Sequence, residues 1–356
     1  MFRIHTGHQL KPLNTMGIDG TVDTYVEWSS AADLHCLFTG PDLSHVVRQS
    51  FKSIGSGSNM LFTRYRVHTP LLRCVNDTIS LVSETDTDVI LTVSAGCELD
   101  RLVEHTCYNG WWGLENLSLI PGTVGGATVQ NVGAYGVEFG NRVVSVTCYD
   151  TETDRTIDIP VCDMAYGYRD SALKHSPLSK RMIVVWTTLR LSKCPAPVLT
   201  YGRLSEFFAD RDEQLSPVDV RDEIIRTRRA KLPDVGITGS AGSFFKNPVV
   251  SADEYNIVLS NARRLGIDTS AMPVHHVTGP DGEPLIKLSA AWFIDKSGWK
   301  GYRRWNVGTW PGQPLVLVNI TGYAAGIEIQ ALAADIIADI SDKWGITLTP
   351  EVEYIK

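Results

Sequence analysis

Glycine is crowded into two short stretches of this chain, and this crowding constrains the fold more than any other feature. The first stretch reads GSGSN at residues 55–59, and the second holds seven glycines between Gly113 and Gly140. Because glycine has no side chain, backbone N–H groups in such stretches can approach phosphate oxygens without obstruction. The first stretch is neither a Walker loop nor a G-x-G-x-x-G fingerprint. Taken alone, it is more simply explained as a glycine turn between two strands.

The second stretch weakens that simple explanation. It contains PGTVGGA at residues 121–127 and NVGAYG at residues 131–136, which is a far rarer combination than a two-glycine turn. A backbone with so few side chains can pack against a flat ligand that carries polar groups at its ends. Two such clusters suit a dinucleotide whose diphosphate is bound by backbone amides.

Composition and charge restrict the remaining possibilities. The chain has 356 residues, 43% hydrophobic and 21% charged, which is typical of a globular protein of two or three domains and excludes intrinsic disorder. A net charge of −7 does not favour a nucleic-acid backbone as partner. No apolar run approaches the roughly 18 residues of a membrane span, and no secretory signal is visible at the start. We therefore expect a cytoplasmic protein without membrane insertion.

Cysteine usage supports the same compartment. The seven cysteines are odd in number and include no C-x-x-C pair, which indicates reduced thiols rather than a disulfide framework. No H-E-x-x-H motif is present, and the histidines are adjacent only at His275 and His276. We expect no metal bound by the protein.

Hydrophobic periodicity and helix-capping signals predict a mixture of helices and strands. Strands are expected at residues 88–94, 143–149, 156–159, 182–191 and 346–349. Helices are expected at residues 98–108, 220–229, 255–265, 290–296 and 326–344. Ser251 with Glu254 forms a capping box, and Ser289 is a further cap. Because only one helix separates the strands of the first half, the pattern favours an α+β fold over a regular βαβ array.

The two glycine stretches, taken with later motifs, resemble the UDP-N-acetylenolpyruvoylglucosamine reductases, the MurB family of flavoenzymes. The later motifs are YRDS at 168–171, TRRAKLP at 227–233, GSFFKNP at 242–248 and PEV at 350–352, while NTMG at 14–17 resembles the family's opening. They follow the family's order and cover essentially the whole chain. One departure is mild: Ser56 stands where many members have Gly or Glu, and a small polar residue is compatible with FAD.

The resemblance implies a three-domain α+β flavoenzyme. Its FAD-binding region is of the vanillyl-alcohol-oxidase-like (PCMH) type, and its C-terminal substrate-binding domain is also α+β. The expected domains are residues 1–72 with 345–356, residues 73–231, and residues 232–344. FAD is expected to bind non-covalently between the first two domains, and the third closes over the substrate. The implied partners are small molecules, NADPH and a UDP-sugar, and we expect a monomer.

The implied reaction has two halves. NADPH delivers hydride to N5 of FAD and leaves, and the enolpyruvyl substrate then receives that hydride at its terminal vinyl carbon. Arg169 and Glu351 stabilise the resulting enolate, and Ser243 protonates it. The product is UDP-N-acetylmuramate, a peptidoglycan precursor.

Each implied catalytic residue also has a simpler explanation. Arg169 resembles the arginine beside the substrate carboxylate, which a guanidinium binds bidentately while staying charged, but it also suits a structural ion pair. Ser243 resembles the proton donor, which needs a strongly basic acceptor such as a carbanion, although a lone serine usually serves a turn. Glu351 is otherwise a solvated tail residue. We expect Glu353, two residues later, to face the opposite way.

Cofactor and substrate contacts are implied by the same motifs. FAD contacts are implied for Gly55, Ser56, Gly57, Ser58, Asn59, Pro121, Gly122, Thr123, Gly125, Gly126, Asn131, Gly133, Ala134 and Tyr135. Substrate contacts are implied for Tyr168, Tyr201, Lys231, Asn247 and Gln313. Tyr201 resembles the loop tyrosine of one subclass, which closes over the nucleotide diphosphate. The cluster of Arg226, Arg228, Arg229 and Lys231 is equally explained as a solvated helix end, with Arg228 a weaker substrate candidate.

Two other classes of protein stay open. A flavin oxidase of the same fold often attaches FAD through His or Cys, but no His lies between Gly113 and Gly140. Release of free FAD when the protein is denatured would argue against an oxidase with covalently attached FAD. A nucleotide-sugar binding protein without turnover is disfavoured by the presence of all three implied catalytic residues. A purified protein without the yellow colour of flavin would favour this binding protein.

Overall fold

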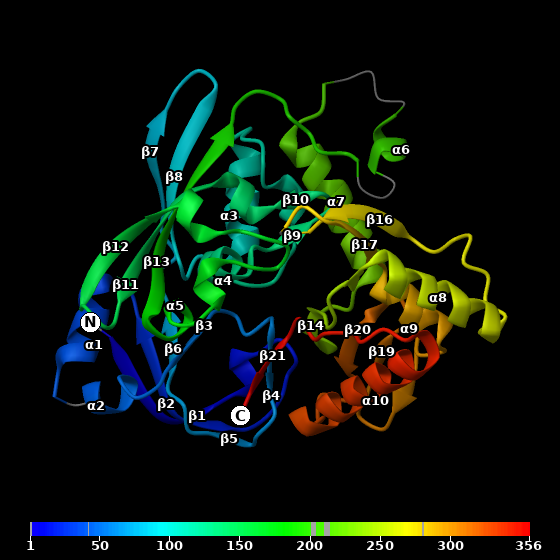
Figure 1. The fold of residues 1–356 in the computed structure, drawn as a ribbon. Coiled ribbons are helices and arrows are strands. Elements are labelled where there is room, and N and C mark those ends of the chain that lie inside the picture. Colours follow the sequence, from blue (N-terminus) through cyan, green and yellow to red (C-terminus); the bar gives the residue numbers. More distant parts are fainter. Residues whose placement is uncertain (1, 42, 201–203, 210–213, 280) are drawn as a thin grey trace. The chain divides into compact units, whose positions relative to one another are not determined.

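The computed structural model describes the chain apart from residues 1, 42, 201–203, 210–213 and 280. The chain forms two compact units, each treated by itself. The first unit comprises residues 1–8, 22–56 and 68–228, and the second comprises residues 9–21, 57–67 and 229–356. The mixture of helices and strands confirms the predicted α+β class (Figure 1). The division into three domains stays a prediction.

An antiparallel sheet forms the centre of the first unit, in the order β12-β11-β13-β8-β7. Its strands are β7 (Ile79–Glu84), β8 (Asp88–Ser94), β11 (Val143–Asp150), β12 (Arg155–Pro160) and β13 (Met182–Ser192), which confirms the four strands predicted there. Val89, Leu91 and Val93 are buried because alternate residues of a strand share one face. They pack in one core with α3 (Leu99–Tyr108) and α4 (Val124–Gln130), which lie beside the sheet (Figure 1).

A smaller sheet of the first unit has the order β1-β2-β6-β3. Its strands are β1 (Arg3–Gln9), β2 (Thr21–Trp28), β3 (Lys52–Ile54) and β6 (Leu71–Cys74), and β6 pairs in parallel with both β2 and β3. The other elements of this unit are α1 (Ala31–Thr39), α2 (Ser44–Val47), β9 (Gly133–Ala134), β10 (Val137–Glu138), α5 (Leu178–Arg181) and α6 (Leu204–Phe208).

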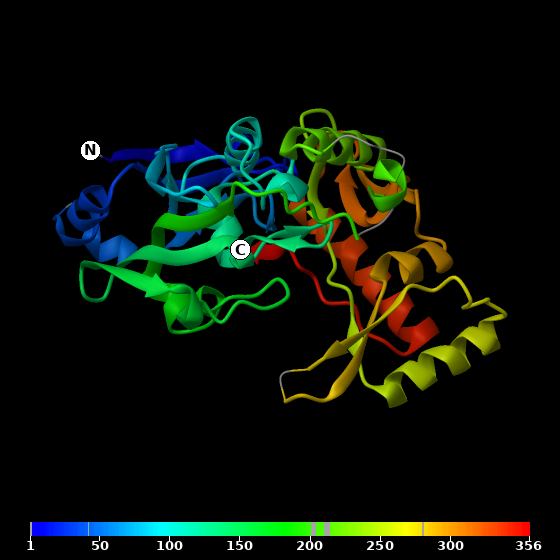
Figure 2. The same ribbon diagram turned by 90° about the horizontal axis from the view of Figure 1, so that it is seen from above.

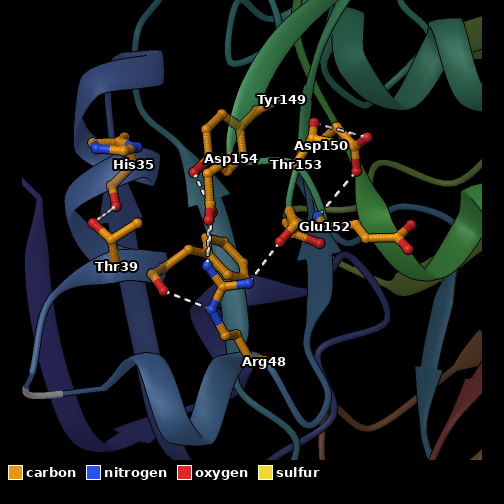
Figure 3. Close-up of polar contacts among 10 residues, drawn as sticks. His35, Thr39, Arg48, Tyr149, Asp150, Glu152, Thr153 and Asp154 are labelled. Carbon is orange, nitrogen blue, oxygen red and sulfur yellow. Dashed lines mark hydrogen bonds and ion pairs between the residues drawn. The ribbon is translucent and has the colours of Figure 1, made fainter.

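Arg48, directly after α2, joins helix α1 to the turn between β11 and β12 (Figure 3). Its guanidinium donates to the carbonyls of Phe38 and Thr151, each at 2.8 Å, and to the Asp154 carboxylate at 2.7 and 2.8 Å. The hydroxyl of Tyr149 also donates to Asp154, at 3.0 Å. One side chain therefore satisfies carbonyls of α1 and of the turn between β11 and β12.

Helix α7 (Pro217–Lys231) is tied to α3 by an ion pair. It begins three residues before the predicted range of 220–229, and the Ser216 hydroxyl accepts from the Asp219 N–H at 3.3 Å. Arg221, whose side chain is 6% exposed, donates to both oxygens of Asp100 at 2.6 and 3.0 Å. Burial acts to raise the pKa of Asp100, but the hydrogen bonds from Arg221 and from the Leu119 N–H outweigh it and lower that pKa.

We expect Arg221→Met to lower the free energy of unfolding at neutral pH by about 3 kcal/mol, because Asp100 is left partly buried without its counter-charge. The folded-state pKa of Asp100 is depressed, so the pair stabilises above the unfolded pKa of about 3.9 and this contribution fades as pH falls through the folded pKa. Urea unfolding measured between pH 7 and pH 3 should therefore show a shrinking difference from wild type. Arg190→Met, at an exposed position on β13, is the control. A difference that does not change with pH would contradict the ionic origin.

The second unit contains the sheets β14-β20-β19-β18 and β15-β17-β16, with β4 and β21 paired in parallel. The strands are β4 (Met60–Phe62), β5 (Arg66–Val67), β14 (Gly239–Ser243), β15 (Val249–Val250), β16 (Val274–Thr278), β17 (Pro284–Leu288), β18 (Arg303–Arg304), β19 (Val307–Trp310), β20 (Gln313–Asn319) and β21 (Glu353–Ile355). The helices are α8 (Ala252–Leu265), α9 (Ala290–Lys296) and α10 (Gly326–Trp344), and α8 packs against α10 (Figure 2).

Local signals located these three helices well. The capping box of Ser251 and Glu254 and the cap by Ser289 are both present, as predicted. Gly266 and Gly345 end α8 and α10 in the left-handed conformation that glycine adopts most easily. The apolar stripe of α10 is buried, with Trp344 fully inaccessible at its end.

The strand predicted at residues 346–349 is wrong. The segment is extended, and Ile346 and Leu348 are buried, so its side chains alternate as they do in a strand. It lacks a ladder, however, and its hydrogen bond to a neighbouring segment joins the Lys246 N–H to the Thr349 carbonyl at 2.9 Å. Regular pairing begins only at β21.

Candidate active site

Close packing within the protein already requires glycine at several positions of the glycine stretches. A Cβ on Gly55 would lie 2.5 Å from the hydroxyl oxygen of Thr123, and one on Gly125 would lie 2.9 Å from the Cβ of Ala95. Neither distance is tolerable without movement. These glycines therefore allow residues 55–56 and the start of α4 to pack closely with the rest of the first unit.

Two features beside this contact are suited to a ligand. Thr123 caps α4 by accepting from the Gly126 N–H at 3.3 Å, and a Cβ on Gly126 would meet nothing closer than that hydroxyl at 3.7 Å. The Ser56 hydroxyl is buried and has no hydrogen-bond partner in the described part of the chain. A buried polar group in this state costs roughly 1–3 kcal/mol unless a ligand satisfies it. The residues present therefore fit the polar diphosphate of FAD.

We expect Gly126→Val to fold and to bind FAD at least tenfold more weakly, a change of roughly 1.4 kcal/mol or more. The added Cβ makes only an ordinary contact, 3.7 Å from the Thr123 hydroxyl, so the protein tolerates it and the side chain would occupy room that a ligand needs. Gly125→Val should instead lower the melting temperature, because its Cβ collides with Ala95. Flavin absorbance per protein after gel filtration, with thermal melts of both variants, separates these outcomes. Full flavin occupancy in a folded Gly126→Val variant would remove Gly126 from the cofactor site.

The side chain of Asn131 is bonded within the protein. Asn131 ends α4 in the left-handed conformation, with φ of 45°. Its Oδ1 accepts from the Gly140 N–H at 2.9 Å, and its Nδ2 donates to the Gly167 carbonyl at 2.8 Å and to the Glu138 carboxylate at 2.9 Å. These bonds brace the end of the glycine-rich segment. The predicted contact of Asn131 with FAD stays a prediction.

The segment then turns sharply at Tyr135. Strands β9 and β10 are joined by Tyr135 and Gly136, with φ values of 49° and 84°, the signature of the type I′ turn that closes two-residue hairpins. The carbonyl of Tyr135 accepts from Asn116 at 2.7 Å, and its side chain is hydrogen-bonded with Arg228 of α7. Desolvation lowers the pKa of Arg228. Arg228, a weak substrate candidate by sequence, thus contacts a predicted FAD residue.

Arg169 occupies a strained turn in the first unit. The N–H of Gly167 donates to the carbonyl of Asp170 and the reverse bond is also present, each at 3.1 Å, so Tyr168 and Arg169 form the centre of a tight turn. Arg169 has φ of 56°, a conformation that costs a non-glycine residue about 1–2 kcal/mol. Its Nη2 donates to the Gly133 carbonyl at 2.6 Å. The backbone strain thus accompanies a guanidinium that is anchored beside β9.

Ser243 is turned outward by a bulge in the second unit. Ser240 pairs with Val318 and Ser243 with Val316, so β14 carries one residue more than β20 between these pairs. Gly242, inside the bulge, has φ of 69°. A bulge redirects the side chains next to it, and Ser243 is exposed at the end of β14.

The structure brings Glu351 beside Ser243. The N–H of Glu351 donates at 2.8 Å to the carbonyl of Phe244, the next residue after Ser243. Asn59 of the first glycine stretch donates from its side chain to the Glu351 carbonyl at 3.2 Å. Gly57 is also needed here for packing, since a Cβ would lie 2.0 Å from a backbone carbonyl. Residues far apart in sequence thus meet in one unit.

The expectation that Glu353 faces away from Glu351 does not follow from strand geometry. Residues two apart on a strand share a face, so strand geometry would align the two carboxylates. Their backbone contacts differ: the Glu351 N–H donates to the Phe244 carbonyl, whereas Glu353 begins β21 and donates its N–H to the Asn59 carbonyl at 3.0 Å. That the two side chains face different ways stays a prediction.

The predicted substrate residues of the second unit lie on neighbouring elements. A Cβ on Gly312 would be 2.5 Å from the Lys231 carbonyl, so Lys231 lies beside the start of β20, where Gln313 is the first residue. Asn247 accepts at 3.0 Å from the N–H of Ala290 at the start of α9. Their contacts with substrate stay predictions. Tyr201 lies outside the described residues.

Lys174, which was not among the predicted site residues, donates to the Arg169 carbonyl at 2.8 Å. No sequence signal marks it, because a lysine in a short polar segment reads as a surface residue.

No helix in the described part of the chain is both long enough and apolar enough to cross a membrane. Within the same residues, no group of three or more His, Cys, Asp or Glu side chains is arranged to hold a metal ion.

Comparisons with known proteins identify the family of the chain. Residues 234–355 match the model of the C-terminal domain of UDP-N-acetylenolpyruvoylglucosamine reductase, and residues 46–158 match an FAD binding domain. The UDP-N-acetylenolpyruvoylglucosamine reductase of Chromobacterium violaceum is 36% identical over 96% of both chains, and that of Porphyromonas gingivalis is 35% identical over 99% of both. The crystal structure of the Thermus caldophilus enzyme covers 100% of both chains with a TM-score of 0.67 at 21% identity, which shows the same fold. The chain therefore belongs to the UDP-N-acetylenolpyruvoylglucosamine reductase family.

Proposed function

We propose that this protein is an FAD-dependent oxidoreductase that uses NADPH to reduce the enolpyruvyl group of UDP-N-acetylenolpyruvoylglucosamine. The product is UDP-N-acetylmuramate, which enters peptidoglycan synthesis. The observation that carries the proposal is the 35–36% identity to named reductases over nearly the whole of both chains. The adjacency of Ser243 and Glu351 in one unit supports it further.

We further propose how this chain holds its cofactor. When bound, FAD supplies the hydride-transfer chemistry that couples NADPH oxidation to substrate reduction. The groups suited to its diphosphate are the buried Ser56 hydroxyl and the open N-terminal face of α4 at Gly126. The other predicted contacts belong to the same two glycine stretches. No histidine lies in the second stretch, which agrees with non-covalent binding.

Side chains of the protein stabilise the negative charge that forms on the substrate and supply the proton that neutralises it. Hydride addition to the vinyl carbon places negative charge on the carbon next to the substrate carboxylate. Arg169 binds that carboxylate and Glu351 donates a hydrogen bond to the developing enolate, so both stabilise charge that exists mainly in the transition state. The Ser243 hydroxyl gives its proton to the carbanion carbon. Tyr168, Lys231, Asn247 and Gln313 are proposed to orient the substrate, with Tyr201 closing over it.

The carboxyl of Glu351 has to be protonated to donate to an enolate. An ionised carboxylate accepts hydrogen bonds only, and it would repel the negative charge that it is meant to stabilise. Arg169 has the complementary role, because a guanidinium carries its charge at every relevant pH and donates through a rigid fork. Arg169 therefore binds the substrate carboxylate as a cation, and Glu351 stabilises the enolate as a neutral acid.

The absorbance spectrum of the purified protein tests the proposal directly. We expect a flavin band that bleaches on anaerobic addition of NADPH and returns on addition of the enolpyruvyl substrate. Denaturation should release free FAD. Protein that purifies with flavin but is not reoxidised by the substrate would contradict the substrate assignment. We also propose a cytoplasmic monomer, which light scattering on the flavin-loaded protein checks for the oligomeric state.

A further inference from the structure

We propose that Lys174 is a positioning residue for Arg169, holding the strained turn at Arg169 in the geometry that presents the guanidinium to the substrate carboxylate. The inference rests on the proposed function, since it concerns the residue that binds that carboxylate. Nothing in the proposed reaction uses Lys174 directly.

Lys174 connects the turn to helix α4. It is the last residue of a short 3-10 turn (Ala172–Lys174) and is partly buried. Its ammonium donates at 2.8 Å to the backbone carbonyl of Arg169 and at 2.8 Å to the side-chain oxygen of Gln130, the final residue of α4. One cation therefore joins Arg169, the second central residue of the turn, to the end of helix α4.

The turn needs such a restraint because its conformation is unfavourable. Arg169 has φ of 56°, and a non-glycine residue leaves this region readily when its surroundings do not hold it. Rotation of the adjoining peptides would swing the carbonyl of Arg169 away and redirect its side chain. The bond from Lys174 holds that carbonyl, while the bond from Asn131 to the Gly167 carbonyl holds the other side of the turn.

Helix α4 lies between the Lys174 hydrogen bonds and the predicted cofactor site. Ser171 donates to the carbonyl of Val129 at 2.6 Å, and Lys174 bonds Gln130, so both bonds reach the C-terminal end of α4. A cation at this end is also favoured by the helix dipole. The N-terminal end of the same helix carries Gly126. A helix of seven residues thus links the turn at Arg169 to the segment proposed to hold FAD.

A positioning role and a merely structural role predict different kinetics. Misplacing a substrate-binding group by about 1 Å can cost roughly 100-fold in rate, and that loss would fall only on the half-reaction that uses Arg169. We expect Lys174→Met to slow reoxidation of the reduced flavin by the enolpyruvyl substrate by roughly 10- to 100-fold. Reduction of the flavin by NADPH and the flavin content should stay near wild type. Lys174→Arg, which keeps donors and charge, should recover most of the rate.

The matched control is Lys180→Met, the same substitution at an exposed position of α5, which should behave as wild type in both half-reactions. The decisive experiment is a double-mutant cycle in anaerobic stopped-flow absorbance. If Lys174 acts only through Arg169, Lys174→Met should have no further effect in an Arg169→Met background.

Several outcomes would overturn the inference. Equal slowing of both half-reactions, loss of FAD, or failure of both Lys174→Met and Lys174→Gln to fold would make Lys174 a structural residue. Slowing that persists in the Arg169→Met background would mean that Lys174 acts on the substrate itself. Failure of the proposed function is distinguishable, because wild-type protein would then not be reoxidised by the substrate at all. A silent Arg169→Met would overturn the role of Arg169 and that of Lys174 with it.

Discussion

Replacing Ser243 by alanine should leave the reduction of flavin by NADPH near the wild-type rate and slow reoxidation by the enolpyruvyl substrate by roughly 10²–10⁴-fold, the usual effect of losing a positioned acid. The two half-reactions separate because Ser243 donates its proton only after hydride has reached the substrate. Anaerobic stopped-flow absorbance follows each half by the flavin band. This is the largest effect we expect from any single substitution in the chain.

The position of Ser243 makes this substitution a clean test. Ser243 is exposed at the end of β14, directly after the bulge, so removing its hydroxyl leaves no cavity in the core. Ser243→Cys should retain part of the rate, because a thiol can also donate a proton. Ser260→Ala, at an exposed position on α8, is the matched control and should react as wild type. Equal slowing of both half-reactions in Ser243→Ala would point to a positional role and end the proton-donor assignment.

Replacing Glu351 by glutamine should also slow reoxidation, by roughly 10²–10³-fold, the cost of weakening one donor to a developing oxyanion. Glutamine keeps the size of the side chain but replaces the acidic O–H with a weaker amide donor. The backbone of Glu351 is held beside Ser243 by its bond to the Phe244 carbonyl, and this bond survives the substitution. The rate constant for reoxidation, measured alongside NADPH reduction, gives the result.

Glu353→Gln is the internal control for this substitution. Glu351 lies two residues before β21 and Glu353 is its first residue. Only Glu351 donates its N–H to the carbonyl of Phe244, the residue after Ser243. We expect Glu353→Gln to change reoxidation by less than a few-fold. If Glu353→Gln were the slower variant, the motif would have been assigned in the wrong register.

Local patterns were sufficient for much of the fold. The strands β8, β11 and β13 were predictable because side chains of period two must place apolar residues on one face. The capping box at Ser251 predicted the start of α8, because a helix start depends on residues three apart. The order of the motifs predicted the family, and the comparisons confirmed it.

The same local patterns misled where hydrogen bonding is decided at a distance. Residues 346–349 alternate in burial as a strand does, but no segment of the described chain pairs with them in a ladder, and β21 forms later against β4. The glycines show the same limit. The family motifs implied FAD contact for Gly55, Gly125 and Gly126 alike, and the structure adds that Gly55 and Gly125 are also required by the close approach of Thr123 and Ala95. Of these three, only Gly126 could accept a Cβ in ordinary contact, 3.7 Å from the Thr123 hydroxyl.

By itself, the sequence determined the family, the α+β class, the helix caps and the identity of the candidate catalytic residues, because these depend on residue types at short and regular spacings. Only the tertiary structure decided that Glu351 lies beside Ser243, that the Ser56 hydroxyl is buried without a partner among the described residues, and that Lys174 bonds the carbonyl of Arg169 in a strained turn. Each of these facts depends on contacts, or on a missing contact, that exist only once the chain is folded. Such contacts depend on how backbones approach one another in three dimensions, and this approach leaves no periodic trace in the sequence.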